Sequence, residues 1–227
     1  MSEKLEVVTI DGPSGVGKST VSRRVAARLG FTYLDTGAMY RAVALQCREK
    51  GVDTGDKASL QELLETLDLE LRPPQSERED VRVFLDGIEV SDRIRTEEIS
   101  MLASAVSALG PVRKTLTRMQ QEIGKRGKIV AEGRDTGTVV FPNAAWKFYL
   151  DADPEERARR RAGQLRGRGE NPDEQEILAL ILKRDRDDSR RTIAPLRAAP
   201  DAVHIDSTSL SPDDVVRLIV EKVRTGR

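Results

Sequence analysis

A short glycine-rich run near the start of the chain has the pattern of a phosphate-binding loop. The run is Gly12-Pro13-Ser14-Gly15-Val16-Gly17-Lys18-Ser19, which fits G-x-x-x-x-G-K-[ST] at every position. Glycines allow backbone N–H groups to turn inward around phosphate oxygens, and the helix that follows directs its positive end at the same anion. Lys18 can then reach the β and γ phosphates while the Ser19 hydroxyl binds the metal. The motif predicts a bound nucleoside triphosphate together with Mg²⁺.

The same motif does not identify the reaction. Identical loops occur in GTPases, helicases, motors and small-molecule kinases, so other residues have to decide among them. A glycine-rich turn that binds nothing is a further alternative. We favour phosphate binding because the run follows an apolar strand, residues 7–10, and opens a helix.

A second polar turn follows the next apolar run. Asp35-Thr36-Gly37 comes directly after that run, and Arg41 falls on the first turns of the helix beyond it. Ligands of open parallel sheets collect at the carboxyl ends of the strands, so this turn is a candidate for binding a second substrate. A helix cap at Asp35 is an alternative that is compatible with binding.

Arginine is concentrated in one later segment, interrupted by glycines. Its arginines are Arg157, Arg159, Arg160, Arg161, Arg166 and Arg168. A solvated helix face paired with nearby glutamates and a nucleic-acid patch are two interpretations of such a run. Beside a phosphate-binding loop we predict instead a mobile lid at about residues 154–170, which covers the transferring phosphoryl group and excludes water. Arg157 and Arg161 share one helix face and are predicted to act in catalysis with Lys18.

Five apolar runs, separated by helical stretches, must hold these residues in place. They cover residues 7–10, 31–34, 129–131, 146–150 and 202–205. Runs without polar alternation suit strands that are buried on both faces, and the intervening helices indicate parallel pairing through crossover connections. We predict a doubly wound α/β fold with a five-stranded parallel core sheet.

Helix starts and a small second sheet are also predicted. Three segments repeat an N-cap residue, a proline and an acidic first turn, with caps at Asp153, Asn171 and Ser211. Alternating apolar residues within 67–91, interrupted by a polar loop and by the turn dipeptide Asp86-Gly87, predict a small antiparallel sheet attached to the core.

Length and composition indicate the number of domains, the kinds of partner and the location of the protein. A length of 227 residues suits a single domain, residues 1–227. The 38 basic residues balance the 38 acidic ones, so we expect no nucleic-acid or membrane partner. The N-terminus lacks a signal-peptide core, so we expect a cytoplasmic protein, and we expect a monomer. The one cysteine, Cys47, is expected to pack a helix, and the one histidine, His204, to be structural.

Four motifs resemble those of bacterial cytidylate kinases and together extend over essentially the whole chain. They are Ile10-Asp11-Gly12-Pro13-Ser14-Gly15, Leu34-Asp35-Thr36-Gly37-Ala38-Met39-Tyr40-Arg41, Gly133-Arg134-Asp135-Thr136-Gly137-Thr138-Val139-Val140-Phe141-Pro142 and Arg184-Asp185-Arg186-Asp187-Asp188-Ser189-Arg190-Arg191. Only the first is generic. The resemblance implies a P-loop NTPase fold of the nucleoside monophosphate kinase type, with a small antiparallel insert, an acceptor-binding portion at about residues 36–110 and an arginine-rich lid.

The resemblance also implies the substrates and the residues that bind them. ATP would be bound by Gly12, Pro13, Ser14, Gly15, Val16, Gly17, Lys18, Ser19 and Thr20. CMP or dCMP would be bound by Thr36, Arg41, Ser104, Arg113, Arg134, Asp135, Arg184, Asp188 and Arg191. The chain departs from the commonest family pattern at Thr36, where Ser is frequent, and at Glu132, where Asp is frequent. Glu132 can hold a Mg²⁺-bound water or can simply orient the loop.

The residue types at the implied positions suit this acceptor. Guanidinium groups such as those of Arg41, Arg134 and Arg191 bind phosphate. For selection of the base we favour Ser104, Arg113 and Asp135, since a carboxylate can accept from the cytosine amino group and reject the uracil carbonyl. A phosphate acceptor is already anionic, with a second pKa of about 6, so the reaction needs no general base.

The predicted reaction is transfer of the terminal phosphoryl group of ATP to CMP or dCMP, giving CDP or dCDP. One alternative is another small-acceptor kinase of the same fold, acting on UMP, AMP or a shikimate-like hydroxyl with Asp11 or Asp35 as the base. The other is a noncatalytic module that binds RNA through the arginines. We disfavour it because aromatic residues, which stack on bases, make up only 4% of the chain.

Overall fold

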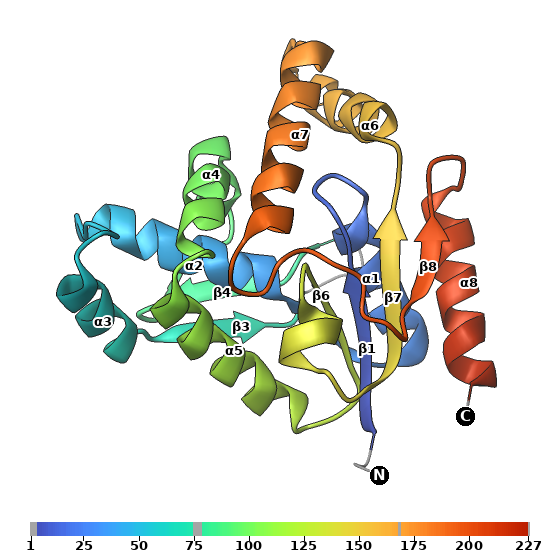
Figure 1. Ribbon diagram of the computed structural model, residues 1–227, viewed down its shortest axis with the longest axis horizontal. Helices are drawn as coiled ribbons and strands as arrows, with labels where there is room; N and C mark the ends of the chain where they lie inside the picture. Colours follow the sequence, from blue (N-terminus) through green and yellow to red (C-terminus); the bar gives the residue numbers. More distant parts are fainter. Residues whose placement is uncertain (1–3, 75–78, 168, 227) are drawn as a thin grey trace.

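A five-stranded parallel sheet forms the centre of the protein (Figure 1). The computed structural model describes residues 4–74, 79–167 and 169–226, and the structural statements below concern those residues. The strands lie in the order β2-β6-β1-β7-β8, and every neighbouring pair is parallel. Their bounds are β1 (Leu5–Asp11), β2 (Thr32–Asp35), β6 (Ile129–Gly133), β7 (Ala144–Asp151) and β8 (Val203–Asp206). The predicted parallel core is therefore confirmed, with strand ends shifted by one or two residues.

The register of the central strands brings their polar carboxyl ends to one level. Asp11 is paired with Gly133 across β1 and β6, and Asp35 is paired with Glu132 across β2 and β6. The apolar residues before them are buried on both faces, as continuous apolar runs predict. Because parallel strands end on the same edge, one edge of the sheet collects these carboxylates beside the loop that follows β1.

Eight α-helices of the described chain surround and extend this sheet. They are α1 (Lys18–Leu29), α2 (Thr36–Glu49), α3 (Lys57–Glu65), α4 (Glu97–Val106), α5 (Gly110–Gly124), α6 (Pro154–Arg166), α7 (Glu174–Arg190) and α8 (Pro212–Thr225), with short turns η1 (Arg93–Arg95) and η2 (Thr136–Val140). Helix α1 contacts both β6 and α8, while α6 and α7 pack on each other and project beyond the carboxyl ends of the strands (Figure 1).

The predicted helix starts are correct in two of three cases. Asp153 caps α6, and Ser211 caps α8 in a reciprocal capping box with Asp214. The start predicted at Asn171 is wrong, because α7 begins at Glu174. The side chain of Asp173 accepts a hydrogen bond of 2.7 Å from the Gln175 N–H and so provides the cap instead.

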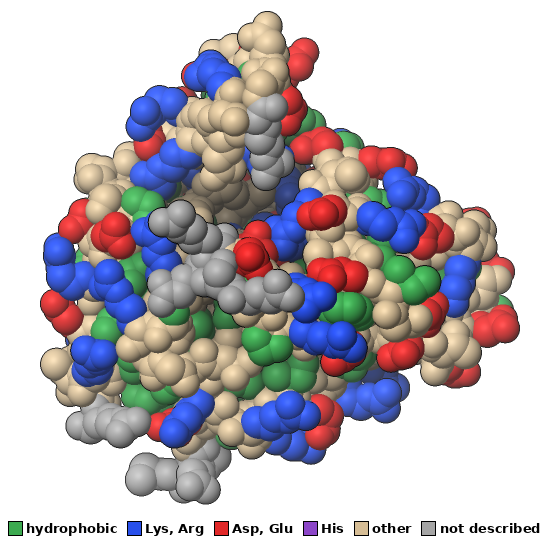
Figure 2. All heavy atoms as spheres, turned by 180° about the vertical axis from the view of Figure 1, so that it is seen from behind, with side chains coloured by type: hydrophobic (Ala, Val, Ile, Leu, Met, Phe, Trp, Pro, Cys, Tyr) green, Lys and Arg blue, Asp and Glu red, His purple; other side chains and the backbone are tan. Residues whose placement is uncertain are grey.

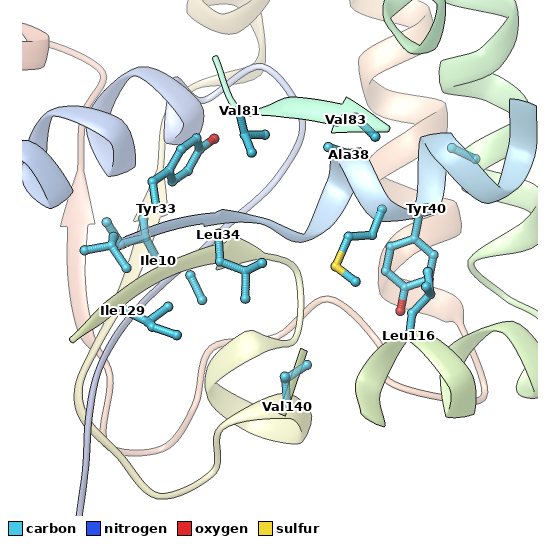
Figure 3. Packing of buried hydrophobic residues seen from close by; sticks show 14 of the residues in the cluster. Ile10, Tyr33, Leu34, Ala38, Tyr40, Val81, Val83, Leu116, Ile129 and Val140 are labelled. Carbon is cyan, nitrogen blue, oxygen red and sulfur yellow. The ribbon is translucent and has the colours of Figure 1, made fainter. Parts of the chain in front are cut away.

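A three-stranded antiparallel sheet forms the insert, as predicted. Its strands are β3 (Leu69–Arg72), β4 (Arg82–Leu85) and β5 (Ile88–Glu89). Asp86 and Gly87 have φ values of 49° and 77°, which is the left-handed turn that this dipeptide favours. Figure 3 shows Val81 and Val83 facing Tyr33 and Ala38, so the small sheet packs on the start of α2. Part of the predicted range, residues 75–78, lies outside the described residues.

The one cysteine and the one histidine of the chain both lie on regular elements of the fold. Cys47 is buried on α2, which confirms that it packs a helix. His204 lies on β8, with its ring centroid 5.4 Å from that of Tyr149. Among the described residues, no cluster of three or more His, Cys, Asp or Glu side chains could hold a metal ion. None of the described helices is both long and apolar enough to span a membrane.

Candidate active site

The glycine-rich loop connects β1 to α1 and closes on itself. A Cβ on Gly12 would lie 2.0 Å from the backbone oxygen of Leu150, so only glycine fits where the loop passes β7. Gly17 is the left-handed N-cap of α1, with φ 95°. Lys18 donates from Nζ to the Pro13 oxygen over 2.6 Å, and its side chain is buried. Burial, followed by the charge of Arg134, holds the pKa of Lys18 well below its ordinary value. An anion bound at the loop would oppose this shift and favour the charged form.

Asp11 connects the glycine-rich loop to the segment that follows β6. Its carboxylate accepts hydrogen bonds from Thr136 N at 2.9 Å, Thr136 Oγ1 at 2.7 Å and Gly137 N at 2.7 Å. Burial raises the pKa of Asp11 to about 6 despite these hydrogen bonds. Asp11 was considered from the sequence only as a possible base, whereas its three hydrogen bonds fix the turn η2. Its place at the end of a core strand was the one available signal for this role.

Glu132 lies at the centre of the carboxylate edge, beside Lys18. Burial and the charge of Asp35 raise the pKa of Glu132 to about 7, against the opposing effects of Lys18 and of the Tyr33 hydroxyl, which donates over 2.6 Å. Ser19 is also close enough to affect this pKa. The Glu132 Oε2 atom is buried without a hydrogen-bond partner. An unpaired carboxylate oxygen and a hydroxyl oxygen are ligands that suit Mg²⁺, so Glu132 and Ser19 fit this ion.

Four arginines predicted to bind the acceptor converge next to this edge. Arg41 donates to Asp35 over 2.9 Å, and Arg134 donates to Asp188 over 2.8 Å. Arg184 is also in this group: burial and the charge of Arg134 lower its pKa to about 10. The Nε atoms of Arg41 and Arg184 are buried without hydrogen-bond partners. Clustered guanidinium groups with unused donors indicate a site for an anion.

Asp188 organises this arginine cluster from within. Its side chain is 1% exposed and accepts from both Arg134 and Arg191. Burial alone would raise the pKa of Asp188, but the guanidinium groups of Arg134 and Arg191 outweigh burial and lower it. The cluster of Arg41, Arg134, Arg184 and Arg191 is thus held by two carboxylates, Asp35 and Asp188, and retains an excess of positive charge.

The residues predicted to select the base adjoin the arginine cluster, and Arg113 and Asp135 among them are buried. Arg113 makes a buried ion pair with Asp135 and donates to the Ser107 oxygen over 2.9 Å. Its guanidinium carbon lies 5.5 Å from the centroid of the Tyr40 ring, a residue that sequence reasoning did not single out. Ser104 lies one turn of α4 before Ser107, whose hydroxyl donates to the Ser104 oxygen over 2.7 Å.

Thr36 holds the start of α2 against the carboxylate edge. Its hydroxyl donates to the backbone oxygen of Glu132 over 2.6 Å. The preceding residue, Asp35, caps α2 by accepting from Ala38 N over 2.8 Å while it also binds Arg41. The Asp35 carboxylate therefore caps α2 and holds Arg41 at the same time, so the cap does not exclude a binding role for this turn.

The predicted lid arginines have different surroundings. Arg157 is 4% exposed and donates to the backbone oxygens of Ala152 and Ser14, each at 2.9 Å, and to Asp185 at 2.6 Å. Arg161 is 35% exposed and lies 3.8 Å from Glu97 of α4. Their contacts with phosphate stay predictions. Of the other arginines in this segment, Arg159 and Arg160 pair with Glu156, and Arg166 pairs with Glu174, all in exposed or half-exposed positions. Arg168 lies outside the described residues.

A cavity of about 470 Å³ opens at the carboxyl ends of β7 and β8. Polar residues dominate its lining, which includes Asp151, Asp153, Arg157, His204, Asp206 and Thr208. Figure 2 shows the molecule hollowed beneath the projecting α6 and α7, and basic and acidic side chains are mixed over that face. The cavity was not predicted from the sequence, because its lining comes from β7, β8, the start of α6 and the loops beside them.

Comparisons with known proteins place the chain in a family. The family model described as cytidylate kinase matches residues 8–225. A cytidylate kinase from Geobacter sp. (strain M21) is 48% identical over 96% of this chain and 92% of that protein, and one from Solibacter usitatus is 45% identical over 98% and 94%. A solved structure of an uncharacterized protein from Eubacterium ventriosum has a TM-score of 0.52 at 12% identity, covering 98% of this chain and 99% of that one, which shows a shared fold alone. The chain belongs to the cytidylate kinase family.

Proposed function

We propose that the protein transfers the terminal phosphoryl group of ATP to CMP and dCMP, giving CDP and dCDP. The observation that carries this proposal is the four-arginine cluster beside the glycine-rich loop, with buried guanidinium donors that have no partner. One phosphate site at the loop and one anion site next to it are what a kinase with a phosphate acceptor requires. Membership of the family makes the protein a nucleoside monophosphate kinase, a phosphotransferase.

The residues around the loop would bring the two substrates into line. Lys18 and the amides of the glycine-rich loop would bind the ATP phosphates, and the arginine cluster would orient the acceptor phosphate. Ser19 and Glu132 would hold Mg²⁺, directly or through its waters, and the ion would neutralise charge on the phosphates. Because the acceptor oxygen is already anionic, no residue has to remove a proton. Asp11 and Asp35 remain free to position Thr136 and Arg41.

Selection of cytosine would depend on the buried pair of Arg113 and Asp135. The ion pair fixes the Asp135 carboxylate as an acceptor, which suits the cytosine amino group and opposes the uracil carbonyl. The cavity at the ends of β7 and β8 would hold the adenosine part of ATP, because it borders Arg157, which binds the glycine-rich loop.

A substrate panel with matched variants tests the proposal. Purified protein is mixed with Mg²⁺ and ATP, and ADP formation is followed with CMP, dCMP, UMP, AMP and shikimate. We expect CMP and dCMP to be the best acceptors, with a loss of at least about a hundredfold for Lys18→Ala. Lys125→Ala, on an exposed lysine after α5, is the control. If UMP or AMP is preferred, the roles of Arg113 and Asp135 are wrong, and if no acceptor turns over, the proposed reaction is wrong.

A further inference from the structure

Asp185 of α7 and Arg157 of α6 together bind both backbone polar groups of Ser14 in the glycine-rich loop. The Ser14 N–H donates to Asp185 Oδ1 over 3.2 Å, from a residue 171 positions away in the chain. Arg157 Nη1 donates to the Ser14 oxygen over 2.9 Å and to Asp185 Oδ2 over 2.6 Å. The three groups form a closed ring of hydrogen bonds. At Ser14, the ring therefore links the position of the glycine-rich loop to the positions of α6 and α7.

Burial and packing make this ring a defined structure. Arg157 and Asp185 are 4% and 18% exposed, and Arg157 Nε is held by the Ala152 oxygen. A methyl group added at Gly15 would lie 3.6 Å from both Arg157 Cβ and Ile181 Cδ1, so both helices lie close to the loop. Charge-assisted hydrogen bonds in such partly buried surroundings are stronger than exposed ones.

The same turns of α7 also enter the acceptor site. Arg184 is the neighbour of Asp185 in the chain and lies in the arginine cluster, and Asp188, one turn later, binds Arg134 and Arg191. Ile181 and Asp185 are one helical turn apart and both contact or approach the glycine-rich loop. One rigid helix thus touches the ATP side through Asp185 and the acceptor side through Arg184 and Asp188.

We propose that Asp185 is a positioning residue that couples occupancy of the acceptor site to the shape of the glycine-rich loop. An acceptor phosphate bound by Arg184 fixes α7, and the ring of Asp185, Arg157 and Ser14 passes that restraint to the loop. Ser14 is held from outside, which leaves the amides of Gly15, Gly17 and Lys18 to the ATP phosphates. This inference rests on the proposed function, because it takes CMP as the ligand of the acceptor site.

Binding measurements can separate coupling from simple stabilisation. The dissociation constant of the non-hydrolysable ATP analogue AMP-PNP, with Mg²⁺, is measured by titration calorimetry with and without saturating CMP. In the unsubstituted protein we expect CMP to tighten AMP-PNP binding about fivefold or more, the ordinary range of coupling between sites. Asp185→Asn should lower that factor below about twofold, because its amide nitrogen would face either the Arg157 guanidinium or the Ser14 N–H, both of which are donors. CMP binding alone should be unchanged.

Two further variants keep the test decisive. Asp187→Asn changes an exposed carboxylate on the same helix and should retain the full coupling. Arg157→Lys keeps the charge but cannot bridge Ser14, Ala152 and Asp185 together, so it should also lose the coupling, and it decides the matter if Asp185→Asn does not fold.

The possible outcomes have distinct meanings. If Asp185→Asn retains the full coupling, with or without a loss of thermal stability, this proposal is wrong. The proposed CMP kinase activity would still stand. An unsubstituted protein in which CMP binds without affecting AMP-PNP also overturns it. If the unsubstituted protein neither binds nor phosphorylates CMP, the proposed function itself is wrong.

Discussion

The two proposed phosphate sites of this protein are built in opposite ways. The ATP side is one continuous turn of backbone between β1 and α1, with Lys18 already bonded to the Pro13 oxygen. The acceptor side is built from side chains that come from α2, the segment after β6, and α7. Apart from Lys18, the ATP side can be changed only by altering the path of the chain, whereas the acceptor side can be changed one charge at a time.

The two sites also differ in how their charges are compensated. The Lys18 ammonium has its hydrogen-bond acceptor within the loop. In the arginine cluster, burial and the neighbouring guanidinium groups lower the pKa values of Arg184 and Arg191, and two Nε donors have no partners. Uncompensated positive charge of this kind opposes folding and favours an anion, so the proposed acceptor site is where we expect stability and binding to be in conflict.

Gly12→Ala should have the largest effect, because it changes the path of the backbone site. The added Cβ would lie 2.0 Å from the Leu150 oxygen, so loop or β7 must move. We expect a loss of roughly 3 kcal/mol in the free energy of unfolding and at least about a hundredfold loss of activity. Gly163→Ala is the control for stability, since nothing lies within 4 Å of its added Cβ, and it should stabilise α6 by about 0.5–1 kcal/mol. Equal stability of the two variants in urea unfolding would contradict the steric argument.

Asp188→Asn should have the next largest effect, because it removes the central charge of the side-chain site. Leaving Arg134 and Arg191 without their carboxylate should lower the free energy of unfolding by about 3 kcal/mol at pH 7. The folded-state pKa of Asp188 lies below its ordinary value of 3.8, so this contribution is complete above about pH 4 and is lost as the pH falls through the lowered pKa. The difference between the two proteins in urea unfolding should therefore shrink at low pH. A difference that does not change between pH 7 and pH 3 would exclude this origin.

Arg184→Gln should separate binding from stability on the acceptor side. Removal of one of several mutually repelling, buried guanidinium groups should leave the protein at least as stable in thermal unfolding. The KM for CMP should rise about ten- to hundredfold, the value of a lost hydrogen bond to a charged group, while the KM for ATP changes little. A marked loss of stability would show instead that the arginine cluster supports the fold.

The contrast between the sites also explains what the sequence could predict. Residues 12–19 are contiguous, so their pattern and flanking strand predicted the turn from β1 into α1, while binding of ATP there stays a prediction. The pairing of Asp188 with Arg134, or of Asp185 with Ser14, joins residues far apart in the chain, and no local pattern encodes it. The start of α7 was misplaced because Asn171 and Asp173 can both cap a helix, and only the hydrogen bond to Gln175 decides between them. Family resemblance supplied the candidate acceptor residues without their contacts.

Arg161→Ala should have the smallest effect on stability and tests whether the lid belongs to the side-chain site. Its one ion pair, with Glu97 at 3.8 Å, is exposed, so the free energy of unfolding should change by less than about 0.5 kcal/mol. If the Arg161 guanidinium contacts the transferring phosphoryl group, kcat for CMP should fall at least about tenfold in Arg161→Ala. Glu97→Ala removes the same ion pair and should leave kcat unchanged. Equal, small changes in kcat for both variants would mean that Arg161 belongs to a solvated helix face, and the side-chain site would then end at α7.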